Sequence, residues 1–339
     1  MNTSQKKMIP FRIKQASHYT LPVVIILIGI LLSVSVFIIV LDWEHQRIQT
    51  RFNQDAEERF EVLKREVESD LHVLDSIKAF YTHGHKIGRS EFRDFVKHFL
   101  LRHRSIRALE WIPRIPNNQR EAYEKAAKQD GFVNFQISDR KAQGKMVRAP
   151  QHKEYFPVYF VEPYEGNEIA LGFDLGSDQV RLEALERSSD TGEMVASARI
   201  KLVQEKAGQF GFLVFEPIYR NDVLMDSVES RREKLEGFVL GVFRIGDIVE
   251  KSVSYLTTKG INFYLYDESA PMPDRFLYFH QSRLSKAVTK SKESETAKSK
   301  AGFQYAKTLD VAGRKWTVLY RPLPEYIAAR RTWQPLGLP

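Results

Sequence analysis

The chain has 339 residues, of which 43% are hydrophobic and 12% aromatic, and this composition excludes a mainly disordered protein. It contains no cysteine, which excludes disulfide bonds, thiolate metal sites and a cysteine nucleophile. The formal net charge is +8, but part of it lies close to the N-terminus, and no basic stripe with interleaved aromatic residues follows. Nucleic-acid binding is therefore not expected.

The first predicted element is an uncharged helix over Leu21–Leu41, with the sequence LPVVIILIGILLSVSVFIIVL. At a rise of about 1.5 Å per residue it spans about 30 Å, the thickness of the hydrocarbon core of a bilayer. It is longer than the apolar region of a signal peptide, and no A-x-A cleavage site follows, which favours an uncleaved transmembrane helix. Basic residues and no acidic ones precede it, so residues 1–20 are predicted to be a cytoplasmic tip and residues from 42 onward extracytoplasmic.

A long stalk helix is predicted within residues 42–89. Apolar residues recur at three- and four-residue steps from about 43 to 81, and no proline or glycine interrupts them before Gly84. This stripe could pack on its own domain, form the seam of a homodimer, or do both in succession. We expect a homodimer, because an uninterrupted stripe of this length suits a seam.

Four histidines near the end of the stalk raise the possibility of a metal site. His83 and His85 have a spacing that suits two ligands on a strand or loop, but no third ligand is placed by spacing. His98 and His103 lie further along the chain. We therefore interpret all four as surface residues, and expect neither a metal nor a cofactor.

Residues 90–236 are predicted to form a first module of mixed helices and strands. Asn118 and Glu121 predict the start of a helix that ends at Gly131. A second helix is expected to start near Ser177 and end at Gly192, with an inward face of Val180, Leu182 and Leu185. Strand-like runs rich in valine and aromatic residues cover 132–137, 155–163, 194–205 and 211–219.

Residues 237–332 are predicted to form a second module. A strand and a helix occupy 237–256, four strand candidates follow, and the Lys/Ser-rich stretch 285–302 is expected to be a surface loop. Residues 333–339 resemble the truncated start of a second membrane segment, with Trp333 at the interface. The predicted fold class is α+β, with largely antiparallel sheets.

Six blocks of this region, taken in order, resemble the CHASE domain, the extracytoplasmic sensor of bacterial membrane receptors and of plant cytokinin-receptor histidine kinases. They are ALEWIPRIPNNQREAYEKAAKQDGF, EYFPVYFVEP, GNEIALGFDLGSDQVRLEALERSSDTGEMV, ARIKLVQE, GFLVFEPIY and EGFVLGVFRIGDIVE. The resemblance covers about residues 90–250. It implies two stacked PAS-like modules on a stalk helix, a small-molecule pocket in the membrane-distal one (90–236), a membrane-proximal one (237–332), and dimers.

The resemblance also suggests site residues. In the cytokinin-binding relatives an aspartate before the middle helix bonds the ligand, and Asp174 stands at the matching position; the alternative is that Asp174 caps that helix. A backbone contact matches Ala196. The apolar residues expected to line the pocket are Phe156, Val158, Phe160, Leu171, Phe173, Leu213 and Phe215. The relatives' later threonine is absent from the apolar FLVF run, so the ligand does not have to be a cytokinin.

The predicted function is therefore the small-molecule-sensing part of a signalling receptor in the bacterial inner (plasma) membrane, and not an enzyme. Relatives of this family continue into a second membrane helix and a cytoplasmic histidine-kinase or GGDEF output, whereas this chain, as a fragment or a natural truncation, carries no such motif. One alternative is a membrane-anchored hydrolase acting through His83, His85 or a carboxylate pair, although no catalytic motif supports it. The other is a tethered interaction protein with a vestigial pocket.

Overall fold

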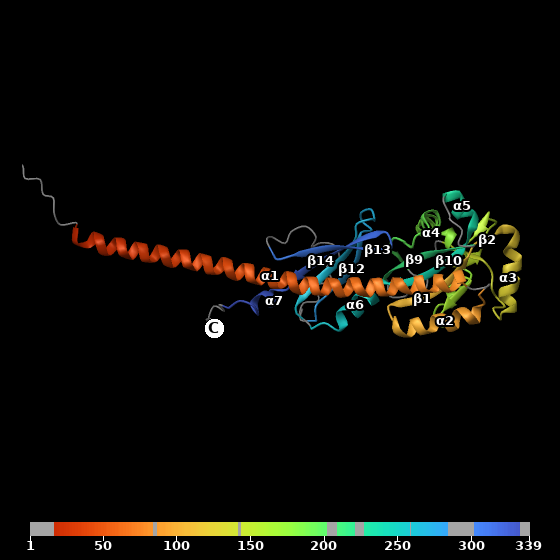
Figure 1. Ribbon diagram of the computed structural model, residues 1–339, viewed down its shortest axis with the longest axis horizontal. Helices are drawn as coiled ribbons and strands as arrows, with labels where there is room; N and C mark the ends of the chain where they lie inside the picture. The colour runs from red at the N-terminus through yellow and green to blue at the C-terminus, as the bar shows by residue number, and fades with distance from the viewer. Residues whose placement is uncertain are drawn as a thin grey trace, which may run out of the picture. The chain divides into compact units, whose positions relative to one another are not determined.

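The computed structural model describes residues 17–83, 87–141, 144–201, 209–220, 227–257, 259–283 and 302–332 (Figure 1). The chain divides into two compact units, one of residues 1–52 and 327–339, and a larger one of residues 53–326. The predicted cytoplasmic basic residues, His85 and Trp333 lie outside the described residues, as does the Lys/Ser-rich loop up to residue 301.

Helix α1 runs from Ser17 to His83 and covers both the predicted transmembrane helix and the predicted stalk. Every residue of 21–41 is exposed, and within the described ranges α1 is the one helix long and apolar enough to cross a membrane. In the larger unit the apolar stripe of α1 is buried, namely Ala56, Phe60, Leu63, Val67, Leu74 and Ile77. This part of the stripe therefore packs within the protomer, and a dimer would have to use another face of the helix.

The remaining helices are short and connect or cover the sheets. They are α2 (Arg89–Arg102), α3 (Arg120–Gln129), α4 (Gln179–Thr191), α5 (Val228–Lys234), α6 (Ile245–Ser254) and α7 (Pro324–Ala328), with the single turns η1 (Asn117–Gln119), η2 (Glu168–Ala170) and η3 (Leu175–Ser177). The helix α4 ends as predicted, since Gly192 adopts the left-handed conformation that closes a helix, with φ 77°.

The first sheet has six strands and is antiparallel throughout, in the order β6-β1-β10-β9-β7 with β8 also paired to β9. Its strands are β1 (Ile106–Pro113), β6 (Phe160–Glu162), β7 (Val195–Ala196), β8 (Ile200–Lys201), β9 (Phe210–Tyr219) and β10 (Leu235–Arg244). Two small antiparallel pairs are also present, β2 (Ile115–Pro116) with β5 (Glu154–Tyr155), and the hairpin of β3 (Ser138–Arg140) with β4 (Met146–Arg148). The predicted α+β class with antiparallel sheets is confirmed.

The strand β10 differs from its predicted place. The sequence suggested that residues 237–244 open the second module, whereas β10 lies between β1 and β9 in the middle of the first sheet. From Gly237 to Phe243 every residue is buried, so the backbone N–H and C=O groups of both edges are shielded from water and need partners, which β1 and β9 supply. The first module therefore continues to the end of β10.

The second sheet has the order β12-β11-β14-β13 and is also antiparallel. Its strands are β11 (Ile261–Asp267), β12 (Phe276–His280), β13 (Tyr305–Val311) and β14 (Arg314–Pro322). Burial alternates strictly along β11, which is the pattern of a sheet with one covered face. A buried pair, Asp267 with Arg314, joins β11 to β14.

Two local predictions in the first module are wrong. Residues 132–137 do not form a strand, because the N–H of Ile137 donates to the carboxylate of Glu124 and Phe135 closes a turn onto Phe132, which leaves no ladder. Asn118 does not cap a helix: residues 117–119 form η1 in front of α3, and α3 has no side-chain cap.

The stalk helix meets the first sheet at Gly241 of β10. A Cβ atom at this position would lie 2.6 Å from the ring of Phe243 and 3.2 Å from Cδ1 of Leu74 on α1. Gly241→Ala is therefore expected to lower the free energy of unfolding by about 1–3 kcal/mol through overpacking. Thermal unfolding of the full chain measures this, with Gly29→Ala, which has no neighbour within 4 Å, as the control; equal melting temperatures would contradict the close approach.

Candidate functional site

The two faces of the first sheet carry adjacent rows of residues with different neighbours. Glu110 of β1 lies opposite Leu240 of β10, which in turn lies opposite Phe215 of β9. The next row, Trp111, Val239 and Glu216, points to the other face, because side chains alternate along a strand. The first row faces a hollow between the sheet and α4, and the second faces the stalk helix α1.

A small recess lies over the first row. It is lined by Glu110, by Arg181 of α4 and by apolar residues, and has a volume of about 20 Å³, which is room for about one water molecule. Its apolar lining consists of Val158, Ala170, Phe173, Leu175, Ile200, Leu213, Leu240 and Val242.

Glu110 is the unusual residue of this recess. It is only 2% exposed, and no described residue forms a hydrogen bond or an ion pair with its carboxyl group. Burial raises the pKa of Glu110 to about 8, and the positive charge of Arg181 opposes that rise only in part. Its carboxyl group is therefore mainly neutral at pH 7, and its O–H group can donate a hydrogen bond within the recess.

Arg181 is buried beside the same recess. Its Nη1 lies 2.8 Å from Oδ2 of Asp178, and its guanidinium stands 5.3 Å from the ring centre of Phe173. Burial lowers the pKa of Arg181, and Asp178 opposes this, but an arginine remains charged at neutral pH. Asp178 also caps α4 by accepting from the N–H of Arg181, so the cap fixes the position of this cation.

A wider hollow of about 400 Å³ adjoins the recess and shares Phe173, Arg181 and Ile200 with it. We call it the mouth. Its other lining residues are Arg140, Lys141, Gly144, Ser177, Asp178, Val180, Arg199 and Lys201. Arg199 is paired with Asp274 at 2.7 Å. Arg140, Lys141 and Lys201 form no ion pair with any described residue, so the mouth carries an excess of positive charge.

The structure places Asp174 away from this recess. Asp174 is 2% exposed, and its Oδ1 accepts from the N–H groups of Phe156 at 2.8 Å and Gly176 at 3.1 Å, which caps η3. Burial raises the pKa of Asp174, and these two bonds oppose the rise. It lines a separate hollow of about 430 Å³ together with Phe156. The predicted cap role is present, although at η3, while α4 is capped by Asp178.

The other predicted site residues fall into three groups. Phe156, Val158, Phe173, Leu213 and Phe215 belong to one buried cluster with Leu171 packed against it, and of these Val158, Phe173 and Leu213 line the recess. Phe160 packs elsewhere, with its ring 5.8 Å from that of Phe92 on α2. The N–H of Ala196 donates to the carbonyl of Ala312 at 2.9 Å, so that group bonds the turn between β13 and β14.

One group of side chains in the described ranges could hold a divalent cation. Three residues, Asp139, His152 and Asp174, each offer one ligand atom, and these three atoms lie within 4.8 Å of one another. His152 Nε2 and Oδ2 of Asp139 are 3.6 Å apart, so the two side chains also form an ion pair when the imidazole is protonated. Of the histidines considered from the sequence, His103 bonds Asp70 of α1 at 2.9 Å.

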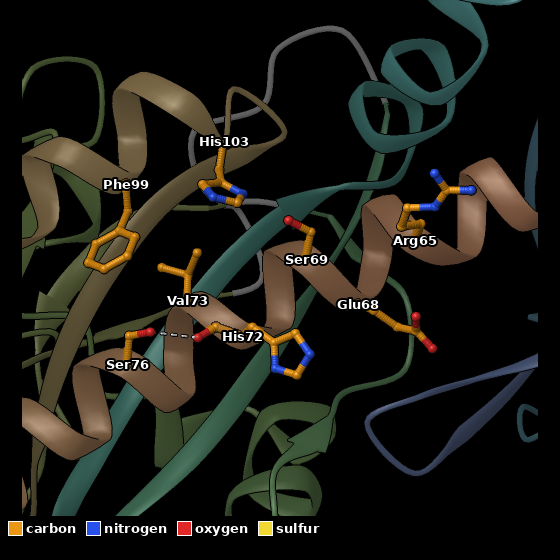
Figure 2. Close-up of a pocket in the computed structure, with 8 residues that line it drawn as sticks. All are labelled: Arg65, Glu68, Ser69, His72, Val73, Ser76, Phe99 and His103. Atoms are coloured by element: carbon orange, nitrogen blue, oxygen red, sulfur yellow. Dashed lines mark hydrogen bonds between the residues drawn. The ribbon is translucent and has the colours of Figure 1, made fainter.

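A further hollow of about 430 Å³ lies between α1 and the end of α2 (Figure 2). Phe99 of α2 and His103 at its end form one side, and Arg65, Glu68, His72 and Val73 lie on the stalk helix. It is an open surface of the stalk rather than an enclosed chamber, and it lies on a face of α1 that the buried stripe does not use.

The stalk helix is fixed to the second row of the sheet by two contacts. Lys78 of α1 forms an ion pair with Glu216, which is 3% exposed. The ring of Tyr81 stacks on Trp111 with centres 4.3 Å apart. Burial raises the pKa of Glu216, and Lys78 opposes the rise. Trp111 directly follows Glu110, so the recess and the stalk contact are one residue apart along β1; on β9 the recess is lined by Leu213, three residues before Glu216.

Sequence reasoning missed both charged residues of the recess. Glu110 stands between apolar neighbours in ALEWIP, and a charged residue inside such a run is the signal that could have identified it. Arg181 lies on the buried face of α4 with Ala184, Leu185 and Ser188. The predicted inward residue Val180 is 37% exposed instead and lines the mouth.

The sequence model of the CHASE domain matches residues 85–278. The chain is similar to hybrid signal transduction histidine kinase A of Dictyostelium discoideum, with 21% identity over 325 residues, 92% of this chain and 15% of that protein. It is also similar to a germination-specific adenylate cyclase of the same organism, with 21% identity over 215 residues, 63% of this chain and 24% of that protein.

The chain thus spans only a minor part of each of these two relatives. Among solved structures it is similar to the periplasmic sensory domain of the Campylobacter jejuni chemoreceptor Tlp1. The identity is 11%, the TM-score is 0.46, and the match covers 87% of this chain and 100% of that one.

Proposed function

Because the chain belongs to the CHASE domain family, we propose that it is the sensory part of a membrane signalling receptor, in which a small molecule bound in the first module shifts the stalk helix α1. The family is one of sensor domains, which supports a binding role rather than catalysis for this chain. The signalling output would lie in a further part of the receptor, of histidine kinase, diguanylate cyclase or cyclase type.

The observation that supports this proposal most strongly is the sheet with two differently occupied faces. On one face the recess holds Glu110, which has no hydrogen-bond or ion-pair partner in the described part of the chain, and a buried polar group without a partner is costly unless something else satisfies it. On the other face the neighbouring residues hold α1 through Lys78 and Tyr81. A ligand that fits one position of β1 and β9 better than another would therefore bias the position of the stalk helix.

The membrane part of the proposal rests on α1. Its exposed apolar residues 21–41 would cross the bilayer, with the basic N-terminus in the cytoplasm and the sheets outside it. We assign this topology to the bacterial inner (plasma) membrane. A homodimer would form along faces of α1 that the protomer leaves exposed, such as the one around Ser69 and His72 in Figure 2, since much of the apolar stripe is already buried.

Ligand binding at the recess is tested by closing its mouth. Val180 lines the mouth and Ile169 does not, and the two are similarly exposed aliphatic residues at 37% and 49%. We screen the full chain in lipid nanodiscs by thermal shift against organic acids, phosphate esters, amines, purines and neutral metabolites. Val180→Trp is expected to weaken the binding of any hit by at least about tenfold, since a bulky ring would occlude the entrance.

The control Ile169→Trp should bind the same hit as the wild type does. If no compound of any class raises the melting temperature, the sensing function proposed for this module is wrong. If a compound binds equally well to Val180→Trp, the site lies elsewhere, and the hollow beside Asp174 is then the next candidate.

A further inference from the structure

We propose that the ligand of the recess and its mouth is a small organic anion, with an acid group bound by the basic residues of the mouth and a hydrogen-bonding group at its other end directed to Glu110. This inference rests on the proposed sensing function and deepens it by naming the chemical class of the ligand. It does not depend on the hollow beside Asp174.

The charged side chains that line the mouth are mainly basic. Five basic side chains line it, from β3, α4, β8 and the adjoining loops, against the single carboxylate of Asp178. Asp178 is already paired with Arg181, and Arg199 with Asp274. The positive charges of Arg140, Lys141 and Lys201 are not balanced within the described residues, so the potential at the entrance favours an anion and opposes an ammonium ion.

The mouth and the recess share part of their lining. Phe173, Arg181 and Ile200 line both hollows, so a molecule that enters the mouth meets an apolar wall with one buried cation in it. Arg181 has a single described carboxylate partner, Asp178, and a guanidinium has five N–H donors. It can therefore bond an additional acid oxygen without losing its existing partner.

The recess is lined by one carboxyl group, that of Glu110. Glu110 is 2% exposed and has no hydrogen-bond or ion-pair partner among the described residues. The other groups that line the recess are Arg181 and apolar side chains from η2, η3, the adjoining loops and strands of the first sheet. Burial raises the pKa of Glu110 to about 8, so at pH 7 it presents a neutral carboxyl group that can donate to an oxygen of a ligand. An anion bound nearby favours the neutral form of this group, whereas an ammonium ion would favour the ionised form.

The volumes agree with a ligand of limited size at the inner end. The recess admits only a group about as large as one water molecule, while the mouth offers about 400 Å³. A hydroxyl or carbonyl oxygen fits the recess, and the acid group with its carbon skeleton fits the mouth. This excludes a bulky ring at the Glu110 end in the conformation observed.

The experiment compares an anion and a cation of similar size. The full chain in nanodiscs is titrated with 3-hydroxybutyrate and glycerol 3-phosphate, and with ethanolamine, while the melting temperature is recorded. Both anions are expected to stabilise the protein at millimolar concentration, and ethanolamine is not. The double substitution Arg140→Gln with Lys201→Gln should weaken the binding of both anions by roughly tenfold. The substitution Lys128→Gln, at an exposed residue of α3, should leave their binding unchanged.

Substitutions of Glu110 identify the inner contact. Glu110→Gln keeps a donor and should bind the anions within about threefold of the wild type, while Glu110→Leu should bind them about tenfold more weakly. Binding to the wild type should fall as pH rises through about 8, because an ionised Glu110 repels the anion, and this dependence should vanish in Glu110→Gln.

Two results would overturn the inference and leave the sensing function intact. One is stabilisation by ethanolamine that is lost in Glu110→Gln, which identifies a cationic ligand. The other is that a compound of another chemical class binds the wild type and is blocked by Val180→Trp, while neither anion binds the wild type. If the screen yields no hit of any class, the proposed function itself fails and this inference fails with it.

Discussion

Glu110→Gln is expected to raise the stability of the protein at pH 8 and to change it much less at pH 5. The carboxyl group has an ordinary pKa of 4.5 when the chain is unfolded and about 8 in the folded protein, so the folded state binds more protons throughout that interval. Stability then falls as pH rises from about 4.5 to 8, since the unfolded state releases the proton first. Glutamine does not ionise and removes this slope.

The size of the effect follows from the shift. Each pKa unit corresponds to about 1.4 kcal/mol, so the wild type should lose on the order of a few kcal/mol across the interval relative to Glu110→Gln. The measurement is the difference in melting temperature between the two proteins at several pH values. Any constant cost of the buried amide cancels in that comparison, because only the change with pH is interpreted.

Glu216→Gln is the matched control for this prediction. Glu216 is equally buried in the same sheet, but it faces α1 and is paired with Lys78. Its replacement breaks an ion pair and should lower the melting temperature at pH 7. A parallel pH dependence for wild type and Glu110→Gln would show that Glu110 is ionised in the folded protein, and would contradict an unpartnered site.

The sequence was sufficient to predict the features that depend on periodicity. The three- and four-residue spacing of the stalk gave a helix and its buried side, which α1 has from Ala56 to Ile77. The uncharged run 21–41, the α+β class and the helix stop at Gly192 also follow from local pattern and backbone preference. The helix, the apolar run and the helix stop depend mainly on residues close together in the chain, so their pattern can be recognised without the tertiary contacts.

Features decided by tertiary contacts were not predictable in this way. The strand β10 was placed in the wrong module because its apolar run fits either sheet, and only its pairing with β1 and β9 decides between them. Residues 132–137 had the composition of a strand, yet Glu124 takes the N–H of Ile137. The recess is lined by Glu110 and Arg181, which are 71 positions apart in the sequence and come together only because α4 packs on the sheet.

Lys78→Met is expected to lower the free energy of unfolding by about 1–3 kcal/mol, because it leaves the buried carboxyl group of Glu216 without its partner, while Lys78 itself is partly exposed. The stalk would still be held by packing, through Leu74 against Gly241 and Tyr81 against Trp111, and by the polar contacts of Glu66 with Lys251 and of Asp70 with Ser105. Thermal unfolding of the full chain gives the loss, and Lys64→Met is the control, since the Lys64–Glu68 pair is exposed and such pairs contribute about 0–1 kcal/mol.

The double variant Lys78→Met with Glu216→Leu separates a structural pair from a signalling contact. An apolar replacement of both partners should restore most of the stability, since no charge then remains buried. If the ion pair carries the ligand response, the double variant should still bind the ligand but transmit it poorly: a spin label at the exposed Ser69 of α1 should move on ligand addition in the wild type and stay in place in the variant. Equal movement in both proteins would show that the Lys78–Glu216 pair does not transmit the shift and that Lys78 only stabilises the fold.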